Sequence, residues 1–146
     1  MTILDTYAVI AFLNGESAAS EVRALLAAGD ARQTAIGVAE TVDHRVRLSG
    51  RSERQAVVDL GLLGLLEAVP VDFAIGADAG RLRARHYHRT RCAVSMADCV
   101  AAAVAQSAHE PLATSDPDLL DMCFREGIAV VPLPGSDGSR WTPPAH

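Results

Sequence analysis

Four carboxylates stand at positions where an acid conflicts with its surroundings. Asp5 and Asp116 each come directly after a short apolar run, Glu40 lies inside a stretch with helical periodicity, and Asp98 begins an Ala- and Val-rich segment. An acid beside apolar residues loses hydration unless a positive charge compensates it. No Arg flanks Asp5 or Asp116 in the sequence. A divalent cation could compensate several of these acids at once.

The acids suit one kind of metal chemistry. Mg²⁺ prefers oxygen ligands and keeps several waters, so a carboxylate cluster without His or Cys favours Mg²⁺ or Mn²⁺. Two such ions about 4 Å apart can activate water and stabilise the leaving oxygen of a phosphodiester. Each acid alone also has a structural explanation, because Asp98 could complement a helix dipole and Asp116 could be an N-cap. Their joint placement favours a shared site.

The basic residues exclude other chemistry. All 13 of them are Arg, and the sequence contains no Lys. Mechanisms that require an ammonium group, such as Walker-A phosphate binding and Schiff-base catalysis, are therefore excluded. A phosphatase of the haloacid dehalogenase type is disfavoured as well, because it needs that Lys and because Tyr7, not an Asp, stands two residues after Asp5.

Short apolar strands alternate with helices along the chain. The expected strands are 2–4, 32–35, 69–71, 112–114 and 128–131, and the expected helices are 7–13, 16–28, 36–48, 52–67, 72–88, 95–108 and 116–125. This alternation predicts an α/β fold, a three-layer α/β/α sandwich around a short parallel sheet. Reactive groups in such folds gather beyond the carboxyl ends of the strands, where Asp5 and Asp116 lie. Gly61 and Gly64 fall inside an expected helix, which close helix packing or a dimer contact would explain.

The chain length and composition predict one domain. Residues 1–133 form the expected domain, and 134–146, rich in Pro, Gly and Ser, form an expected flexible tail that Trp141 could pin. Acids interrupt every long apolar stretch, so we expect neither an export signal nor a membrane span. Three cysteines without a CxxC pair indicate free thiols in a reducing cytoplasm.

Arginines are concentrated between Asp78 and Asp98, a segment without any acid. The formal net charge of −5 argues against a generally basic nucleic-acid binder, but this segment leads directly into the Asp98 helix. Guanidinium groups suit phosphate recognition, although a solvated helix face balanced by acids elsewhere would also explain them. The candidates for RNA contact are Arg81, Arg85, Arg89 and Arg91.

The order of these segments resembles the PIN-domain family, in which an acid ends the first strand and a Ser or Thr follows. The matching segments are Asp5–Glu16, Ala39–Glu40, Ser95–Ala103 and Leu112–Leu119. The last contains the family's Thr-x-Asp element, although Leu119 stands where an aromatic residue is common. The similarity covers about residues 2–131 in order.

PIN domains of this length resemble VapC toxins, which are Mg²⁺-dependent endoribonucleases restrained by a cognate antitoxin. The resemblance implies RNA as substrate, Mg²⁺ or Mn²⁺ as cofactor and an antitoxin protein as partner. It assigns metal-binding and catalytic roles to Asp5, Glu40, Asp98 and Asp116. Thr6 and Thr114 would support these acids, and Asp118 is a further candidate ligand.

Two other functions stay open at this point. A degenerate PIN domain could act as a binding module, although the presence of all four acids disfavours it. A metal-dependent nuclease could cut DNA instead, because chemistry at a phosphodiester does not select the sugar. The apolar helices favour a homodimer.

Overall fold

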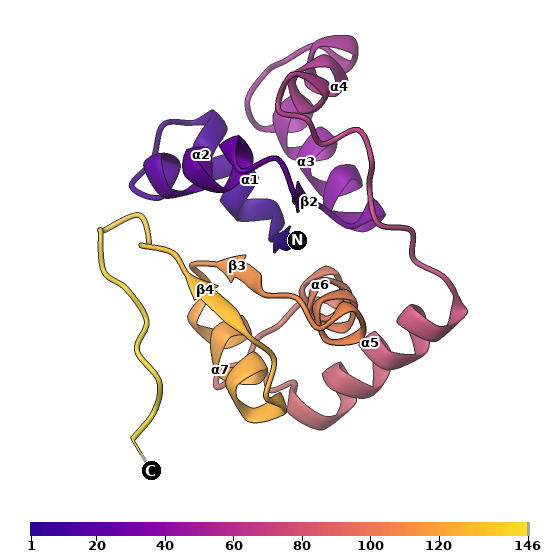
Figure 1. Ribbon diagram of the computed structural model, residues 1–146, viewed down its shortest axis with the longest axis vertical. Coiled ribbons are helices and arrows are strands. Elements are labelled where there is room, and N and C mark those ends of the chain that lie inside the picture. The colour runs from indigo at the N-terminus through magenta and orange to yellow at the C-terminus, as the bar shows by residue number, and fades with distance from the viewer. Residues whose placement is uncertain (146) are drawn as a thin grey trace.

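Four short strands form the centre of the fold. In the computed structural model, which describes residues 1–145, they are β1 (Thr2–Leu4), β2 (Ala31–Arg32), β3 (Leu112–Thr114) and β4 (Val130–Pro132). Their order in the sheet is β2-β1-β3-β4, and every neighbouring pair is parallel (Figure 1). The carboxyl ends of β1 and β3 therefore meet at the same edge of the sheet.

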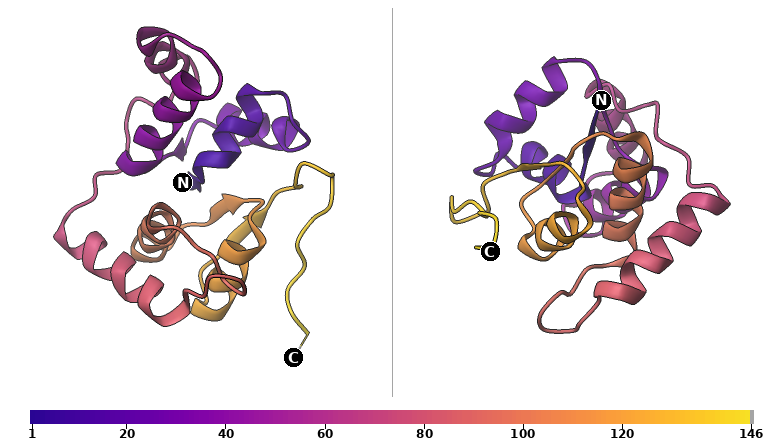
Figure 2. Two further views of the ribbon diagram at one scale, coloured as in Figure 1. Left: turned by 180° about the vertical axis from the view of Figure 1, so that it is seen from behind. Right: turned by 60° about the horizontal axis from the view of Figure 1, so that its bottom comes forward.

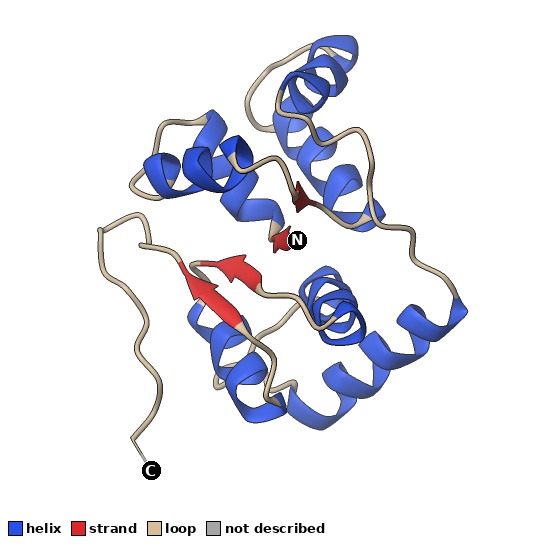
Figure 3. Cartoon of the chain, in the orientation of Figure 1, coloured by secondary structure: helices blue, strands red, loops and turns tan. Residues whose placement is uncertain are grey.

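Helices connect the strands and cover both faces of the sheet (Figure 3). They are α1 (Thr6–Leu13), α2 (Ala19–Ala27), α3 (Ala35–Arg47), α4 (Glu53–Leu62), α5 (Phe73–His86), α6 (Met96–Ala108) and α7 (Pro117–Glu126). Within the described part of the chain, no helix is both long and apolar enough to cross a membrane.

Alternating strand residues separate two hydrophobic layers. Ile3 and Leu112 are fully buried on one face with residues of α5, α6 and α7, while Leu4 and Ala113 are buried on the other with residues of α1, α2 and α4. Successive strand side chains point to opposite faces, so each of these short strands contributes to both cores. Figure 2 shows helices on both sides of the strands from two further directions. The predicted α/β/α sandwich is confirmed.

The helix after Ser52 ends earlier than the sequence suggests. It stops at Leu62 rather than near residue 67, because Gly64 adopts a left-handed backbone with φ +78°. The amide of Leu65 then donates to the carbonyl of Leu60 at 3.1 Å, a bond that closes the helix end. Gly64 is thus a helix stop, and the interpretation of this residue as a packing or dimer glycine inside a helix is wrong.

The expected strand over 69–71 is reduced to a single bridge between Thr34 and Val69. The amide of Val69 donates to the carbonyl of Gln33, and the amide of Ala35 donates to the carbonyl of Val69, both at 2.9 Å. Pro70 has no N–H to extend this ladder, so the pairing ends there.

The C-terminal segment is attached to the domain by side-chain contacts. Arg140 bonds both carboxyl oxygens of Glu21, at 2.6 and 2.9 Å, and the carbonyl of Pro132 at 2.6 Å. The indole N–H of Trp141 donates to Asp121 at 2.8 Å, so Trp141 makes the expected anchoring contact. The division of the chain at residue 133 stays a prediction, and His146, the end of the expected tail, lies outside the described residues.

Candidate active site

The register of the two central strands places Asp5 next to Thr114. Leu4 pairs with Ala113, so the next residue on each strand meets at the carboxyl edge of the sheet. The amide of Asp5 donates to the carbonyl of Ala113 at 3.1 Å, and the hydroxyl of Thr114 donates to Oδ2 of Asp5 at 2.9 Å. Asp5 is only 4% exposed. A buried carboxylate is therefore held by a hydroxyl from the neighbouring strand.

Asp116 begins α7 as its N-cap, two residues after β3. Its Oδ1 accepts from the amides of Asp118 and Leu119, and its own amide donates to the hydroxyl of Thr114 at 3.1 Å. Thr114 thus links Asp5 to Asp116. The carboxylate of Asp118 accepts from the amide of Ala93 at 3.0 Å, so it holds the loop before α6, and its role as a metal ligand stays a prediction.

Asp98 belongs to the first turn of α6, where it forms a capping box with Ser95. The hydroxyl of Ser95 accepts from the amide of Asp98 at 3.0 Å, and Oδ2 of Asp98 accepts from the amide of Ser95 at 2.8 Å. Both bonds satisfy amides at a helix N-terminus that have no helical partner. The Ser-x-x-Asp pattern that fixes Asp98 is a capping signal visible in the sequence, and it adds Ser95 to the residues that support the predicted acids.

Glu40 reaches the same region from α3. Its Oε1 accepts a hydrogen bond from the hydroxyl of Thr6 at 2.8 Å, and Thr6 is the first residue of α1, directly after Asp5. The two residues that the sequence predicted as supports, Thr6 and Thr114, therefore each bond one of the predicted site acids. They connect three separate elements, β1, β3 and α3, around the N-terminus of α1.

The acids affect one another's protonation. Burial raises the pKa of Asp5 to about 7, and the negative charges of Asp98 and Asp116 add to this increase, while the Thr114 hydroxyl opposes it. Burial likewise raises the pKa of Asp98 to about 6, with further contributions from Asp116 and Glu40. The pKa of Asp116 is also raised, first by burial. The predicted site acids thus lie within electrostatic reach of one another.

The four acids have the donor chemistry for a hard divalent cation. Among residues 1–145, none of them forms an ion pair with Arg, His or the N-terminal amine within 4.0 Å. No direct ion pair within the described residues therefore compensates their mutual repulsion, and oxygen-only donors match Mg²⁺ or Mn²⁺.

The side chains of this cluster are not yet spaced as a metal coordination site within the described residues. In the described residues, no three His, Cys, Asp or Glu side chains stand close enough together to hold a metal ion. Hydrogen bonds to Thr6, Ser95 and Thr114 instead engage an oxygen of Glu40, Asp98 and Asp5 respectively.

The predicted arginines divide into two kinds. Arg81 pairs with Asp78 at 2.7 Å and Arg85 pairs with Glu126 at 3.0 Å, so both are balanced within the fold. Arg89 and Arg91 are exposed in a loop closed by the bridge between His88 and Cys92. RNA contact by all four stays a prediction.

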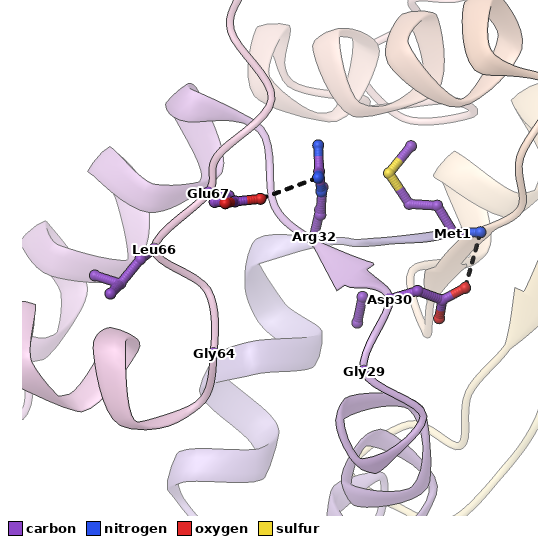
Figure 4. A pocket seen from close by; sticks show the side chains of 8 residues that line it. Met1, Gly29, Asp30, Arg32, Gly64, Leu66 and Glu67 are labelled. Carbon is purple, nitrogen blue, oxygen red and sulfur yellow. Dashed lines mark hydrogen bonds and ion pairs between the residues drawn. The ribbon is translucent and has the colours of Figure 1, made fainter.

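A cavity of about 480 Å³ lies elsewhere, at the edge of β2 (Figure 4). Its charged groups already have partners, because the Met1 ammonium pairs with Asp30 at 3.0 Å and Arg32 pairs with Glu67 at 3.1 Å. None of the four acids lines it. We therefore place the candidate site at the carboxyl edge of β1 and β3 and not in this cavity.

Solved structures with a similar fold come from several bacteria. FitAcB from Neisseria gonorrhoeae gives a TM-score of 0.64 at 23% identity, covering 89% of this chain and 96% of that chain. VapBC2 from Rickettsia felis, bound to a fragment of its promoter DNA, gives 0.64 at 17% identity, covering 89% and 96%. A toxin–antitoxin complex from Klebsiella pneumoniae gives 0.60 at 17% identity, covering 80% and 87%. At these identities the likeness establishes the fold.

The sequence itself provides the family. A search of curated proteins finds no match. A family model described as "PIN domain" matches residues 2–125, which span β1 to α7 and include all four acids. Because this match covers most of the chain, the protein belongs to the PIN-domain family.

Proposed function

We propose that this protein is an endoribonuclease that depends on Mg²⁺ or Mn²⁺ held by Asp5, Glu40, Asp98 and Asp116. PIN domains are generally nucleases and generally use divalent metal ions. The observation that carries the proposal is the convergence of these acids at one edge of the sheet, where burial raises the pKa values of Asp5, Asp98 and Asp116. A bound divalent cation would supply Lewis acidity at the phosphodiester and lower the pKa of an attacking water.

The chain's own residues have three tasks in this scheme. Thr114 and Thr6 orient the acids, because each hydroxyl donates to one carboxylate oxygen. Asp5 responds most strongly to a cation, because without one burial raises its pKa to about 7 and a bound cation would favour its ionised form. The N-termini of α1, α6 and α7 lie at these acids and place positive dipole ends beside them.

We also propose that the protein is the toxin of a toxin–antitoxin pair, with a cognate antitoxin as partner. Support comes from the structural neighbours, two of which are described as toxin–antitoxin or VapBC assemblies. Three buried cysteines without a disulfide are consistent with a cytoplasmic protein. Exposed apolar side chains on and after α4, including Leu62 at 79% and Leu66 at 76%, favour a homodimer or a protein partner.

Purified protein should cleave RNA when Mg²⁺ or Mn²⁺ is added and should stop when a chelator removes the ion. Single-stranded RNA and DNA of the same sequence, labelled at the 5′ end and resolved on a denaturing gel, give the measurement. We expect cleavage of the RNA only. Equal cleavage of DNA would contradict the proposed selectivity for RNA. Cleavage that persists in excess chelator would reject the metal-dependent site.

The same assay tests the partner. Addition of the protein encoded next to this gene should suppress cleavage at a stoichiometric ratio. Cleavage that continues at saturating amounts of that protein would contradict the toxin proposal and leave the nuclease proposal intact.

A further inference from the structure

A cavity of about 340 Å³ opens beside Asp116, and the proposed function gives it no role. Its walls come from α1, the turn before α2, the turn between β3 and α7, and the C-terminal segment. Its lining includes Tyr7, Glu16, Ser17, Ser115 and Ser136. The volume falls within the range of small-ligand pockets, about 300–1,000 Å³.

Tyr7 divides this cavity from a smaller one. The second cavity, of about 120 Å³, contains Glu40 and shares Tyr7 as a lining residue. If the phosphodiester of a polynucleotide lies at the acids, its flanking nucleotides lie next to Tyr7, because Tyr7 lines both the cavity with Glu40 and the cavity with Asp116. Of these two cavities, the one beside Asp116 has the volume expected for a nucleobase.

The ring of Tyr7 is held in place but not covered. It stands edge-to-face against His44, with ring centroids 6.2 Å apart and an interplanar angle of 88°. It is nevertheless 59% exposed. An exposed aromatic face with a fixed orientation offers a stacking platform, because every nucleobase has a π-face.

The polar lining favours a neutral base over a phosphate. The hydroxyls of Ser115 and Ser136 can donate or accept hydrogen bonds, and that of Ser17, which donates to the carbonyl of Ser136 at 3.4 Å, can still accept one. Among the described residues that line the cavity there is no Arg or His, and Glu16 and Asp116 are acids. Glu16, which lies outside the proposed metal site, repels phosphate but can accept hydrogen bonds from an exocyclic amino group, such as N4 of cytosine.

The C-terminal segment completes the outer wall. Pro134, Gly135 and Ser136 line the cavity. The segment turns at Gly135, whose amide donates to the carbonyl of Ser139 at 2.7 Å and whose carbonyl accepts from the amide of Gly138 at 2.9 Å. Arg140 on Glu21 then fixes the segment. This wall joins α2 to the end of β4, so the cavity depends on residues beyond the matched family region, 2–125.

We propose that this cavity binds one unpaired nucleobase of the RNA strand, stacked on Tyr7, enclosed by the C-terminal wall and directly next to the phosphodiester held at the acids. The inference rests on the proposed ribonuclease function, which it deepens by naming a subsite for single-stranded substrate. Glu16 gives the pocket a carboxylate that can accept hydrogen bonds from the N–H donors of a base.

Binding of a short, fluorescently labelled phosphorothioate RNA in Ca²⁺, followed by anisotropy, tests the pocket. Tyr7→Ala should weaken binding about tenfold, as expected for the loss of one base–aromatic stack. Tyr7→Phe should stay close to wild type, because the ring is retained. Phe73→Ala, at an aromatic residue that is 92% exposed on α5, is the matched control and should not change binding.

Abasic substitutions, scanned along the same RNA, separate stacking from general damage. At one position, an abasic RNA should bind wild type about as weakly as the intact RNA binds Tyr7→Ala. The affinity of Tyr7→Ala should be the same for this abasic RNA as for the intact RNA. Arg140→Ala should also weaken binding, with a change in Trp141 fluorescence that reports release of the wall.

The outcomes distinguish this inference from the function on which it rests. Unchanged binding by Tyr7→Ala while wild type cleaves RNA would overturn the pocket alone. Additive losses at every abasic position would overturn it too. Failure of wild type to cleave any RNA in Mg²⁺ or Mn²⁺ would instead contradict the proposed function.

Discussion

The Asp5→Asn variant should lose RNA cleavage by at least about a thousandfold and, at pH 8 without divalent ions, be more stable than wild type. The first effect follows from removal of a carboxylate at the centre of the acid cluster. The second follows from burial: Asp5 has a pKa of about 7 in the folded protein against an ordinary value of 3.8. Asparagine keeps the oxygen that accepts from Thr114 and removes the charge.

The sign of the stability change depends on pH. Because the pKa of Asp5 is higher in the folded state, the unfolded chain releases this proton first as the pH rises. Ionisation of Asp5 therefore lowers the stability of the fold progressively from about pH 4 to about pH 7, by roughly 4 kcal/mol at most above pH 7. Urea unfolding of both proteins at pH 5 and pH 8 measures the difference in their free energies of unfolding, which should be clearly larger at pH 8 than at pH 5.

Asp43→Asn is the matched control for this prediction. Asp43 lies on α3 and pairs with Arg47 at the surface, where its carboxylate is 59% exposed. The control should keep the cleavage rate and nearly the stability of wild type. An Asp5→Asn variant that cleaves RNA at the wild-type rate would reject the assigned site, and one that is less stable at pH 8 would reject the account of its burial.

Acidification should weaken the response to metal steeply. Cation binding requires the carboxylates to be ionised, and Asp5 and Asp98 have pKa values of about 7 and about 6. Between pH 7.5 and pH 5.5, protonation of these two groups should raise the Mg²⁺ concentration for half-maximal cleavage about a hundredfold. Acids with ordinary pKa values would give almost no change over this interval.

Cleavage rates measured across Mg²⁺ titrations at several pH values provide the comparison. The Asp98→Asn variant, if it retains measurable cleavage in Mn²⁺, should show a shallower dependence because one titrating group is gone. A half-maximal Mg²⁺ concentration that stays constant from pH 7.5 to pH 5.5 would contradict the coupling of protons and metal.

Local sequence signals were sufficient for the centre of the fold. An apolar run that ends at Asp5 and another that ends at Thr114 predict two strands, and parallel pairing then brings their ends together. The ordered acids placed the candidate site at this edge. The helix end at the left-handed Gly64 could not be predicted, because a glycine that ends a helix within an apolar stretch has the same local sequence pattern as a packing glycine.

Contacts between distant parts of the chain could not be predicted. Arg140 pairs with Glu21, a residue far away in the sequence that only the folded protein brings close. The cavity wall formed by the C-terminal segment depends on this pair, so it could not be predicted either. The sequence gives no signal for a role of Tyr7, because next to Asp5 and Thr6 it resembles an ordinary helix residue. Its exposure and its contact with His44 are properties of the folded protein. The Ser95 cap, by contrast, follows from a local pattern that sequence alone could have provided.

Direct titration of Mn²⁺ into the RNA-free protein at pH 7.5, followed calorimetrically, tests the central claim that acids from four separate elements share a divalent ion. Wild type and Asp43→Asn should bind Mn²⁺ alike, whereas Asp5→Asn and Asp98→Asn should each bind at least about tenfold more weakly. Equal Mn²⁺ affinity in all four proteins, or no binding by wild type at millimolar concentrations, would contradict it.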